Sequence, residues 1–169
     1  GACEECVSSC TVGNILYSDG GCNSCVDSSK TAIGVVVKDN ELVMSQIGYS
    51  VWASGGLNYW DVNTTLYDYE DDIQAKTDYN GKSNTATIIV EETKNGAASD
   101  CNSYTTTGTS AGDWYLPAAG ELYSYASSNY NAINNAMLAL GWTDLSYISF
   151  WSSTENSSPA KYLSMYSSE

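Results

Sequence analysis

Five of the six cysteines lie within the first 25 residues, at Cys3, Cys6, Cys10, Cys22 and Cys25, and the sixth is Cys101. Cross-links this dense constrain the fold of a short segment strongly, because each one closes a loop of the chain. An even number of cysteines is typical of disulfide-bonded proteins from oxidising compartments. We therefore expect three disulfides, one of which links Cys101 to the N-terminal cluster.

Zinc is the alternative ligand for the same cysteines. Cys3-x-x-Cys6 and Cys22-x-x-Cys25 have the spacing of a four-thiolate zinc site. Such a site would leave the other two cysteines without partners, which favours disulfides. The pairing stays open, because six cysteines allow about 15 connectivities.

The charged residues exclude several classes of function. The chain has 20 acidic and six basic residues, all six of them lysine, and a net charge of −14. Without histidine there is no Ser-His-Asp triad and no imidazole proton shuttle, and without arginine there is no bidentate phosphate clamp. A strongly negative chain is a poor partner for nucleic acid. We expect no enzymatic activity, no cofactor and no nucleic-acid partner.

The sequence patterns favour one main domain that follows a short, disulfide-linked N-terminal segment. Residues 1–30 are rich in Cys, Ser and Gly and carry little periodicity, whereas residues 31–169 carry strand and helix patterns. Apolar runs stay short of the ~18 residues that a membrane span needs. No leader opens the chain, so we expect an extracellular or cell-surface protein whose signal peptide has been removed.

The domain begins with a predicted hairpin. Thr31 to Lys38 is apolar and β-branched, as in a buried strand. Asp39-Asn40 is a turn signal, and Glu41 to Ile47 reads as the returning strand. We expect an antiparallel hairpin over residues 31–47 and, more weakly marked, a helix over residues 85–92.

Two helices are predicted after a short strand at Asp113–Leu116. Pro117 suits the first position of a helix, where its missing N–H costs nothing. Asn129 suits the cap of a second helix, and Gly141 suits its end. The apolar stripe of that second helix comprises Ala132, Ile133, Ala136, Met137 and Leu140.

The C-terminal stretch returns to strand character. Tyr147 to Trp151 is the clearest strand, Ser152 to Pro159 is a polar loop, and Ala160 to Tyr166 alternates with period two. This alternation predicts that Leu163 and Met165 face the core, whereas Tyr162 and Tyr166 face solvent or a ligand.

An acidic cluster precedes one short helical stretch. Carboxylates at Asp68, Glu70, Asp71 and Asp72 are the type of ligand that calcium prefers. The spacing of a known calcium loop is missing, however, and acids in the first turn of a helix are common. We favour a helix running from this cluster toward Asp78.

Two motifs resemble a known family. Asp113-Trp-Tyr-Leu-Pro-Ala-Ala-Gly-Glu-Leu122 and Phe150-Trp-Ser-Ser-Thr-Glu155 are similar to the Trp-Tyr-Leu-Pro and Trp-Ser-Ser-Thr-Glu motifs of a bacterial extracellular group. This group includes the C-terminal domain of Legionella collagen-like adhesins, the domain-of-unknown-function 1566 group. The resemblance is good over residues 110–166 and loose over residues 31–60.

The resemblance implies an α+β, C-type-lectin-like fold, with small twisted antiparallel sheets and two helices. It implies structural roles for Trp114, Glu121 and Glu155. Formylglycine-generating enzymes and retroelement variable proteins share this fold. The enzymes need late cysteines, and this chain has none after Cys101. Its C-terminus lacks the basic last strand of the family, which would leave an open sheet edge.

These observations favour a secreted or surface-displayed, adhesin-like module that binds a protein or a glycan. The alternative is a structural subunit of an extracellular filament or surface assembly, joined through an open sheet edge. Tyr and Trp supply contact area, and Asn and Ser supply adaptable hydrogen bonds. The candidate ligand-binding residues are Tyr147, Trp151, Asn156, Ser157, Ser158, Tyr162 and Tyr166.

Overall fold

The computed structural model describes residues 6–46, 66–91, 96–155 and 162–164. The chain divides into two compact units, which we describe separately. The first comprises residues 1–48, 106–109 and 128–146, and the second comprises residues 49–105, 110–127 and 147–169.

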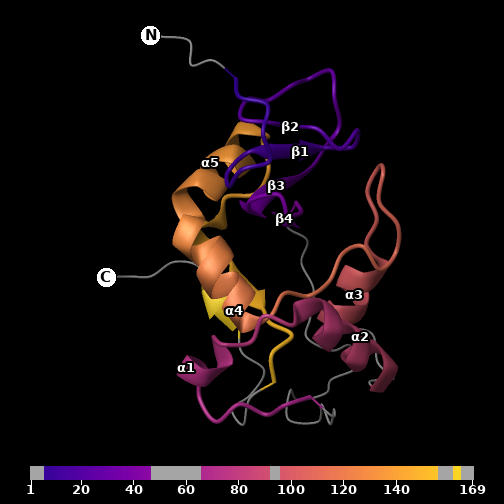
Figure 1. Cartoon of the computed structure of the whole chain (residues 1–169), viewed down its shortest axis with the longest axis vertical. Coiled ribbons are helices and arrows are strands. Elements are labelled where there is room, and N and C mark those ends of the chain that lie inside the picture. The colour runs from indigo at the N-terminus through magenta and orange to yellow at the C-terminus, as the bar shows by residue number, and fades with distance from the viewer. Residues whose placement is uncertain (1–5, 47–65, 92–95, 156–161, 165–169) are drawn as a thin grey trace. The chain divides into compact units, whose positions relative to one another are not determined.

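A four-stranded antiparallel sheet forms the centre of the first unit (Figure 1). The strands lie in the order β2-β1-β3-β4. The β3–β4 pair confirms the hairpin predicted over residues 31–47. Asn40 adopts a positive φ of 55° in its turn, a conformation that Asn tolerates better than most residues. The strand bounds are β1 Ile15–Tyr17, β2 Cys22–Asn23, β3 Ala32–Lys38 and β4 Leu42–Met44.

The buried residues of β3 form much of this unit's core. Val35, Val36 and Val37 are all buried, because neighbours cover both faces of the strand. β1 pairs with β3 along its other edge, with Ile15 opposite Val35. The sheet therefore includes strands from both sides of residue 30, where the sequence suggested a boundary between the cysteine-rich segment and the main domain.

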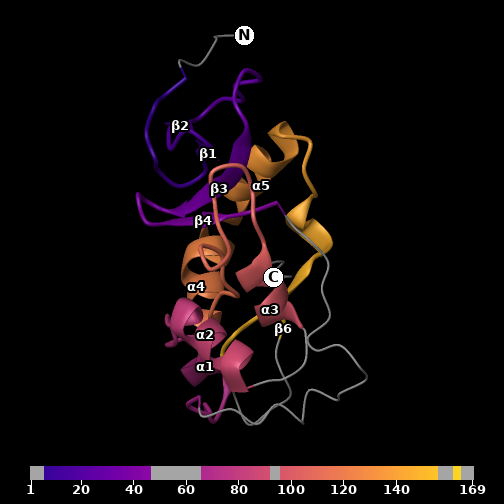
Figure 2. The same ribbon diagram turned by 90° about the vertical axis from the view of Figure 1, so that its right-hand side faces the viewer.

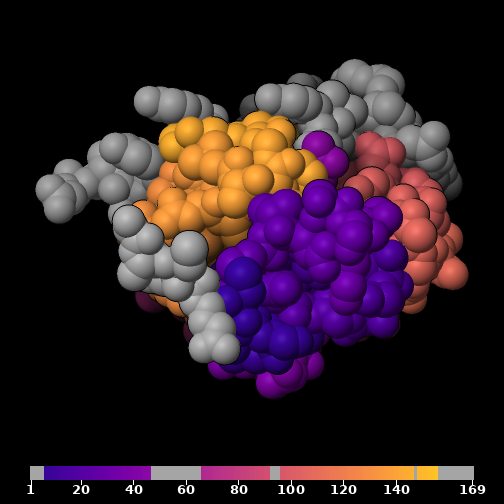
Figure 3. All heavy atoms as spheres, turned by 90° about the horizontal axis from the view of Figure 1, so that it is seen from above, coloured from indigo at the N-terminus to yellow at the C-terminus, as the bar shows by residue number. Residues whose placement is uncertain are grey.

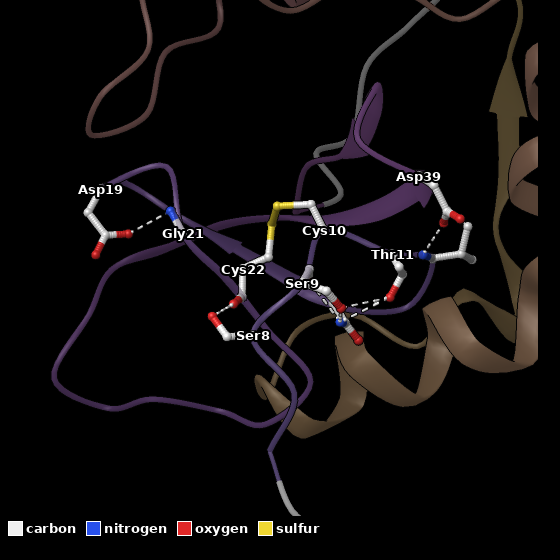
Figure 4. Close-up of a disulfide and its surroundings, with 10 residues drawn as sticks. Ser8, Ser9, Cys10, Thr11, Asp19, Gly21, Cys22 and Asp39 are labelled. Atoms are coloured by element: carbon white, nitrogen blue, oxygen red, sulfur yellow. Dashed lines mark hydrogen bonds between the residues drawn. A yellow bond between two sulfur atoms is a disulfide. The ribbon is translucent and has the colours of Figure 1, made fainter.

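Two disulfides cross-link the N-terminal segment. Cys6 bonds to Cys25 and Cys10 bonds to Cys22, and Figure 4 shows the second bridge with its surrounding hydrogen bonds. We predicted a bridge from the N-terminal cluster to Cys101, and this prediction is wrong. These four cysteines pair with one another, and Cys101 is a free thiol. Cys3 lies outside the described residues.

Helix α5, Tyr130–Ala139, packs against β3, and Figure 3 shows orange atoms directly beside purple atoms of the N-terminal part of the chain. Of its predicted stripe, Ile133, Ala136 and Met137 are buried, whereas Ala132 is exposed. Asn129 occupies the cap position without a side-chain capping hydrogen bond.

The end of α5 is a complete glycine-terminated motif. Gly141 has a φ of 70°, and its N–H donates to the carbonyl of Leu138 at 3.0 Å. The N–H of Trp142 donates to the carbonyl of Met137 at 2.9 Å. This pair of bonds satisfies carbonyls that the helix leaves unpaired, and it confirms the predicted end at Gly141.

The second unit combines short helices with a two-stranded sheet. Helices α2 and α3 contact each other, and they lie side by side in Figure 1 and in Figure 2. The predicted helix over residues 85–92 is present and starts earlier, at Gly81. Its elements are α1 Asp72–Ala75, α2 Gly81–Glu91, α3 Ala97–Ser103, α4 Ala119–Glu121, the π-helix η2 Leu122–Ala126, β5 Ser149–Trp151 and β6 Tyr162–Ser164.

Two short 3-10 helices complete the described elements, η3 Ser127–Asn129 and η4 Leu145–Tyr147. The predicted strand at Asp113–Leu116 is wrong, since this stretch belongs to no strand. The helix after it begins at Ala119, with Ala118 as its cap, rather than at Pro117.

The architecture is a mixed α+β fold, as expected, with more helices than the two that the resemblance implied. The C-type-lectin-like topology stays a prediction. Among the described helices, none is long and apolar enough to cross a membrane.

Candidate functional site

Strands β5 and β6 carry two of the seven predicted ligand-binding positions, Trp151 and Tyr162, and a third, Tyr147, lies just before β5. The antiparallel register places Trp151 opposite Tyr162 and Phe150 opposite Leu163. Tyr147 lies in the turn of 3-10 helix that precedes β5. The structure therefore brings the backbone positions of Trp151 and Tyr162 together. The remaining predicted positions, Asn156, Ser157, Ser158 and Tyr166, lie outside the described residues, as does Met165.

Trp151 is half-buried and packs against an apolar cluster. The tryptophan thus contributes packing to the second unit as well as partly exposed surface, a common position for this amphipathic ring. The fully buried members of the cluster are Ile88, Ala97, Ala98 and Leu116, and Leu66, Ile89 and Cys101 pack around them.

The loop after β5 begins in the interior, although the sequence suggested a polar surface loop. Ser152, Ser153 and Thr154 are only 3%, 1% and 7% exposed. The N–H of Ser153 donates to the carbonyl of Pro117 at 2.8 Å. Thr154 donates its hydroxyl to Asp78 at 2.9 Å and accepts from the N–H of Ala119 at 2.8 Å. The two family-like motifs are therefore hydrogen-bonded to each other.

Asp78 is the centre of this buried network. Its Oδ2 accepts from the Asn84 amide at 2.7 Å and from Thr154. Its Oδ1 accepts from the backbone N–H of Asn80 at 2.9 Å and from the Asn80 side chain at 3.1 Å. A carboxylate offers about four acceptor positions. All four are used by protein donors, so Asp78 acts as a structural acceptor.

The N-terminus of α4 is the second centre. The first N–H groups of a helix have no partner within the helix. Here Ala118 donates to Glu121 Oε2 at 2.8 Å, Ala119 donates to Thr154, and Gly120 donates to the carbonyl of Asp78 at 2.9 Å. Each donor is thus paired with a different part of the second unit. This pattern confirms the capping role that the resemblance implied for Glu121.

The buried Glu121 forms a hydrogen-bonded pair with the partly buried Tyr115. The Tyr115 hydroxyl donates to Glu121 Oε1 at 2.8 Å. Burial raises the pKa of Glu121 above its usual range, although hydrogen bonds from Ala118 and Tyr115 oppose the shift. Burial and the Glu121 carboxylate raise the pKa of the Tyr115 hydroxyl as well. The pair has the features of a structural contact, because both carboxylate oxygens of Glu121 accept hydrogen bonds from donors of the protein.

Two further tyrosines lie beside the loop after β5. The N–H of Tyr69 donates to the carbonyl of Glu155 at 3.1 Å. The rings of Tyr67 and Tyr69 pack edge to face with centroids 4.7 Å apart, and Tyr67 is 68% exposed. Sequence reasoning missed both residues, although the Tyr67-x-Tyr69 spacing is a period-two signal of one aromatic face.

The acidic cluster acts as a helix start. Asp71 caps α1, accepting from the N–H of Gln74 at 2.8 Å. This geometry confirms that a helix begins at the acidic cluster, but α1 ends at Ala75, before it reaches Asp78. Within the described part of the chain, no group of three or more acidic or cysteine side chains could hold a metal ion.

The Cys101 thiol is held in a protonated form. Burial, with a smaller effect of Asp100, raises the pKa of Cys101 to about 11. A thiol with such a pKa is a weak nucleophile near neutral pH, because the thiolate is the reactive species.

No protein-family profile, no curated protein and no solved structure matches this chain.

Proposed function

We propose that this protein is a secreted or surface-displayed, adhesin-like binding module. Its ligand is a protein or a glycan, and its contact surface is formed by the C-terminal strands and the loop between them, extended by Tyr67. One observation carries the proposal: the loop after β5 begins in a buried, hydrogen-bonded anchor, and at Glu155 it lies beside Tyr69, whose ring packs against that of the exposed Tyr67.

A rigid anchor under a variable loop is the usual architecture of a binding surface. Ser153 and Thr154 tie the start of the loop to Pro117, Ala119 and Asp78. A preorganised loop loses less conformational entropy when a ligand binds. The anchor therefore supports recognition by the residues that follow it.

The residue types on this surface also support recognition. Tyrosine and tryptophan supply large, rigid contact area, and asparagine and serine adapt their hydrogen bonds to the ligand. The chain holds 14 tyrosines and five tryptophans against one phenylalanine. This preference for aromatic rings with a polar group supports partly exposed aromatic surfaces.

The buried acids support binding rather than catalysis. Asp78 and Glu121 are the buried carboxylates of the described residues. Their oxygens accept hydrogen bonds from backbone and side-chain donors that hold the fold together. The disulfides are compatible with an oxidising, extracellular compartment.

A protein array and a glycan array, probed with the purified chain, test this proposal. We expect at least one ligand whose binding falls about tenfold when a central tyrosine of the surface is truncated. The test variants are Tyr67→Ala and the double variant Tyr162→Ala with Tyr166→Ala. Tyr67→Phe is the matched control, because it keeps the ring and should keep most of the affinity.

Binding that is unchanged in all of these variants would overturn the proposed surface. Size-exclusion chromatography over a dilution series tests the alternative function. A chain that binds nothing on either array and forms oligomers that persist on dilution would favour an assembly subunit over a binding module.

A further inference from the structure

A second aromatic surface of the second unit lies away from β5 and β6 in sequence. It comprises Lys76 and Tyr79, which follow α1, and Tyr123, Ser124 and Tyr125 of the π-helix η2. We call these five residues the η2 surface. Tyr79 is 45% exposed and Tyr123 is 46% exposed. Neither residue belongs to the ligand surface proposed above.

Side-chain contacts order the rings of the η2 surface. The rings of Tyr79 and Tyr125 have centroids 5.7 Å apart at an interplanar angle of 52°. The Tyr79 hydroxyl hydrogen-bonds to Ser124 Oγ at 2.7 Å. Two segments that are distant in sequence thus present one surface of partly exposed tyrosines.

The backbone beneath the η2 surface is tightly packed. Gly120, which directly precedes Glu121 and η2, donates its N–H to the carbonyl of Asp78. A Cβ at Gly120 would overlap this carbonyl and lie 2.7 Å from the carbonyl of Lys76. The turn that carries Lys76 and Tyr79 therefore packs against the first turn of α4. π-helical turns are rare and occur frequently at functional sites.

A cation already lies on one ring of this surface. The Lys76 ammonium is 4.0 Å from the centroid of the Tyr123 ring. Such a contact is attractive because the face of an aromatic ring is electron-rich. The face of Tyr123 thus accepts an ammonium group, which in this structure is that of Lys76.

The charge around the η2 surface favours a cationic partner. Asp71 and Asp72 begin α1, the helix that Lys76 ends, and both are exposed. The chain as a whole carries a net charge of −14. A negative field of this kind attracts a cationic partner and repels an anionic one.

We propose that the η2 surface docks a cationic segment of a partner protein, with a partner arginine or lysine stacked on the tyrosine rings. In the unbound chain Lys76 covers Tyr123 and competes with the partner side chain for that ring. Tyr79 and Tyr123 supply the contact, and Asp71 and Asp72 supply the attraction. An arginine is the better occupant, since its planar guanidinium stacks on aromatic rings.

Fluorescence anisotropy with two labelled peptides tests the proposal. The probe is an alternating Arg-Gly peptide, and the control peptide has Gln in place of each Arg. We expect the Arg-Gly peptide to bind and the Gln-Gly peptide not to bind. Truncation of one ring, in Tyr123→Ala or Tyr79→Ala, should weaken binding about threefold to fivefold. Tyr123→Phe should bind as the wild type does.

Lys76→Gln gives the sharper result. Removal of the competing ammonium should tighten binding of the Arg-Gly peptide about threefold to fivefold. Lys82→Gln removes the same charge from the exposed side of α2 and is the matched control, for which we expect a smaller change.

Three outcomes would overturn the proposal. Equal effects of Lys76→Gln and Lys82→Gln would show that the peptide binds through non-specific electrostatics alone. Wild-type affinity in Tyr79→Ala and Tyr123→Ala would exclude the rings. A neutral oligosaccharide that binds in a Tyr123-dependent manner, without any binding of the Arg-Gly peptide, would assign the η2 surface to a glycan. The ligand-surface variants Tyr67→Ala and Tyr162→Ala should leave peptide binding unchanged, which separates this test from the previous one.

Discussion

The side-chain hydroxyl of Thr85 is the hydrogen-bond partner of the Leu116 backbone, a role that a neighbouring strand would have in a sheet. Thr85 Oγ1 accepts from the N–H of Leu116 at 3.0 Å and lies 3.1 Å from the carbonyl oxygen of the same residue. It also lies within hydrogen-bonding distance of the Gly81 carbonyl, at 2.8 Å. Both residues are buried, so their polar groups need partners within the protein. One side chain of α2 thus holds the segment that was predicted to be a strand.

Replacement of Thr85 by valine should therefore destabilise the second unit. Valine has nearly the shape of threonine, but it leaves the buried N–H of Leu116 without an acceptor. We expect a loss of about 1–3 kcal/mol in the free energy of unfolding, measured by urea denaturation. Thr85→Ser keeps the hydroxyl and should cost less. Equal stability of Thr85→Val and the wild type would contradict this role.

A methyl group at Gly81 should also destabilise the chain. A Cβ at this position would overlap Glu121 Oε2 and lie 2.8 Å from the backbone nitrogen of Ala118. Gly81→Ala gains up to about 1 kcal/mol of helix propensity. Overpacking costs about 1–3 kcal/mol, so we expect a net loss of stability by urea denaturation. Lys82→Ala, at an exposed site of the same helix, is the control, with an expected change within about 0.5 kcal/mol.

Glu121 should give the second unit an unusual dependence on pH. Burial raises the pKa of Glu121 above the ordinary 4.5, so the folded state binds its proton more tightly than the unfolded state does. Its contribution is fully present below pH 4.5 and is lost as the pH rises through the raised pKa. Glu121→Gln removes this ionisation and should become relatively more stable as the pH rises.

Urea unfolding of the wild type and of Glu121→Gln between about pH 4 and about pH 7 measures the effect. The difference between the two proteins is the useful quantity, because other carboxyls titrate in both. A hydrogen bond with Lys30, for example, lowers the pKa of Asp19, whose contribution therefore has the opposite sign. A difference that does not vary with pH would contradict the prediction.

Each disulfide should stabilise the N-terminal segment. The two bridges span 19 and 12 residues, for which loop-closure entropy gives about 3 kcal/mol each. Loss of one bridge, in Cys6→Ser with Cys25→Ser or in Cys10→Ser with Cys22→Ser, should lower the urea midpoint. The bridges are nested, so each one still constrains the unfolded chain when the other is lost, and the loss of both should cost more than the sum of the two single losses. Additive losses would contradict this nesting argument.

Local patterns allowed several elements to be predicted correctly. The β-branched run of β3 and its turn at Asn40 specify a hairpin, because residues close in the sequence form the whole unit. Gly141 ends α5 for a similarly local reason, since only two backbone hydrogen bonds and one positive φ are involved. Asp71 caps α1 within a single turn. The propensities of neighbouring residues are sufficient in each case.

The candidate site depended on contacts that no local pattern contains. Ser152, Ser153 and Thr154 read as a polar surface loop, yet they are buried because distant groups satisfy their hydrogen bonds. The tyrosines of the η2 surface come from two segments that are distant in sequence: the hydrogen-bonded Tyr79 and Ser124 are 45 residues apart.

The sequence by itself therefore determined the hairpin, the start of α1, the end of α5 and the chemistries that are excluded by the lack of histidine and arginine. These depend on residue type and on short-range geometry. The tertiary structure decided the pairing of the described cysteines, the loss of the strand at Asp113–Leu116 and the burial of the loop after β5. Those outcomes depend on which distant donor or acceptor reaches a polar group, and a buried polar group is stable only when such a partner is found.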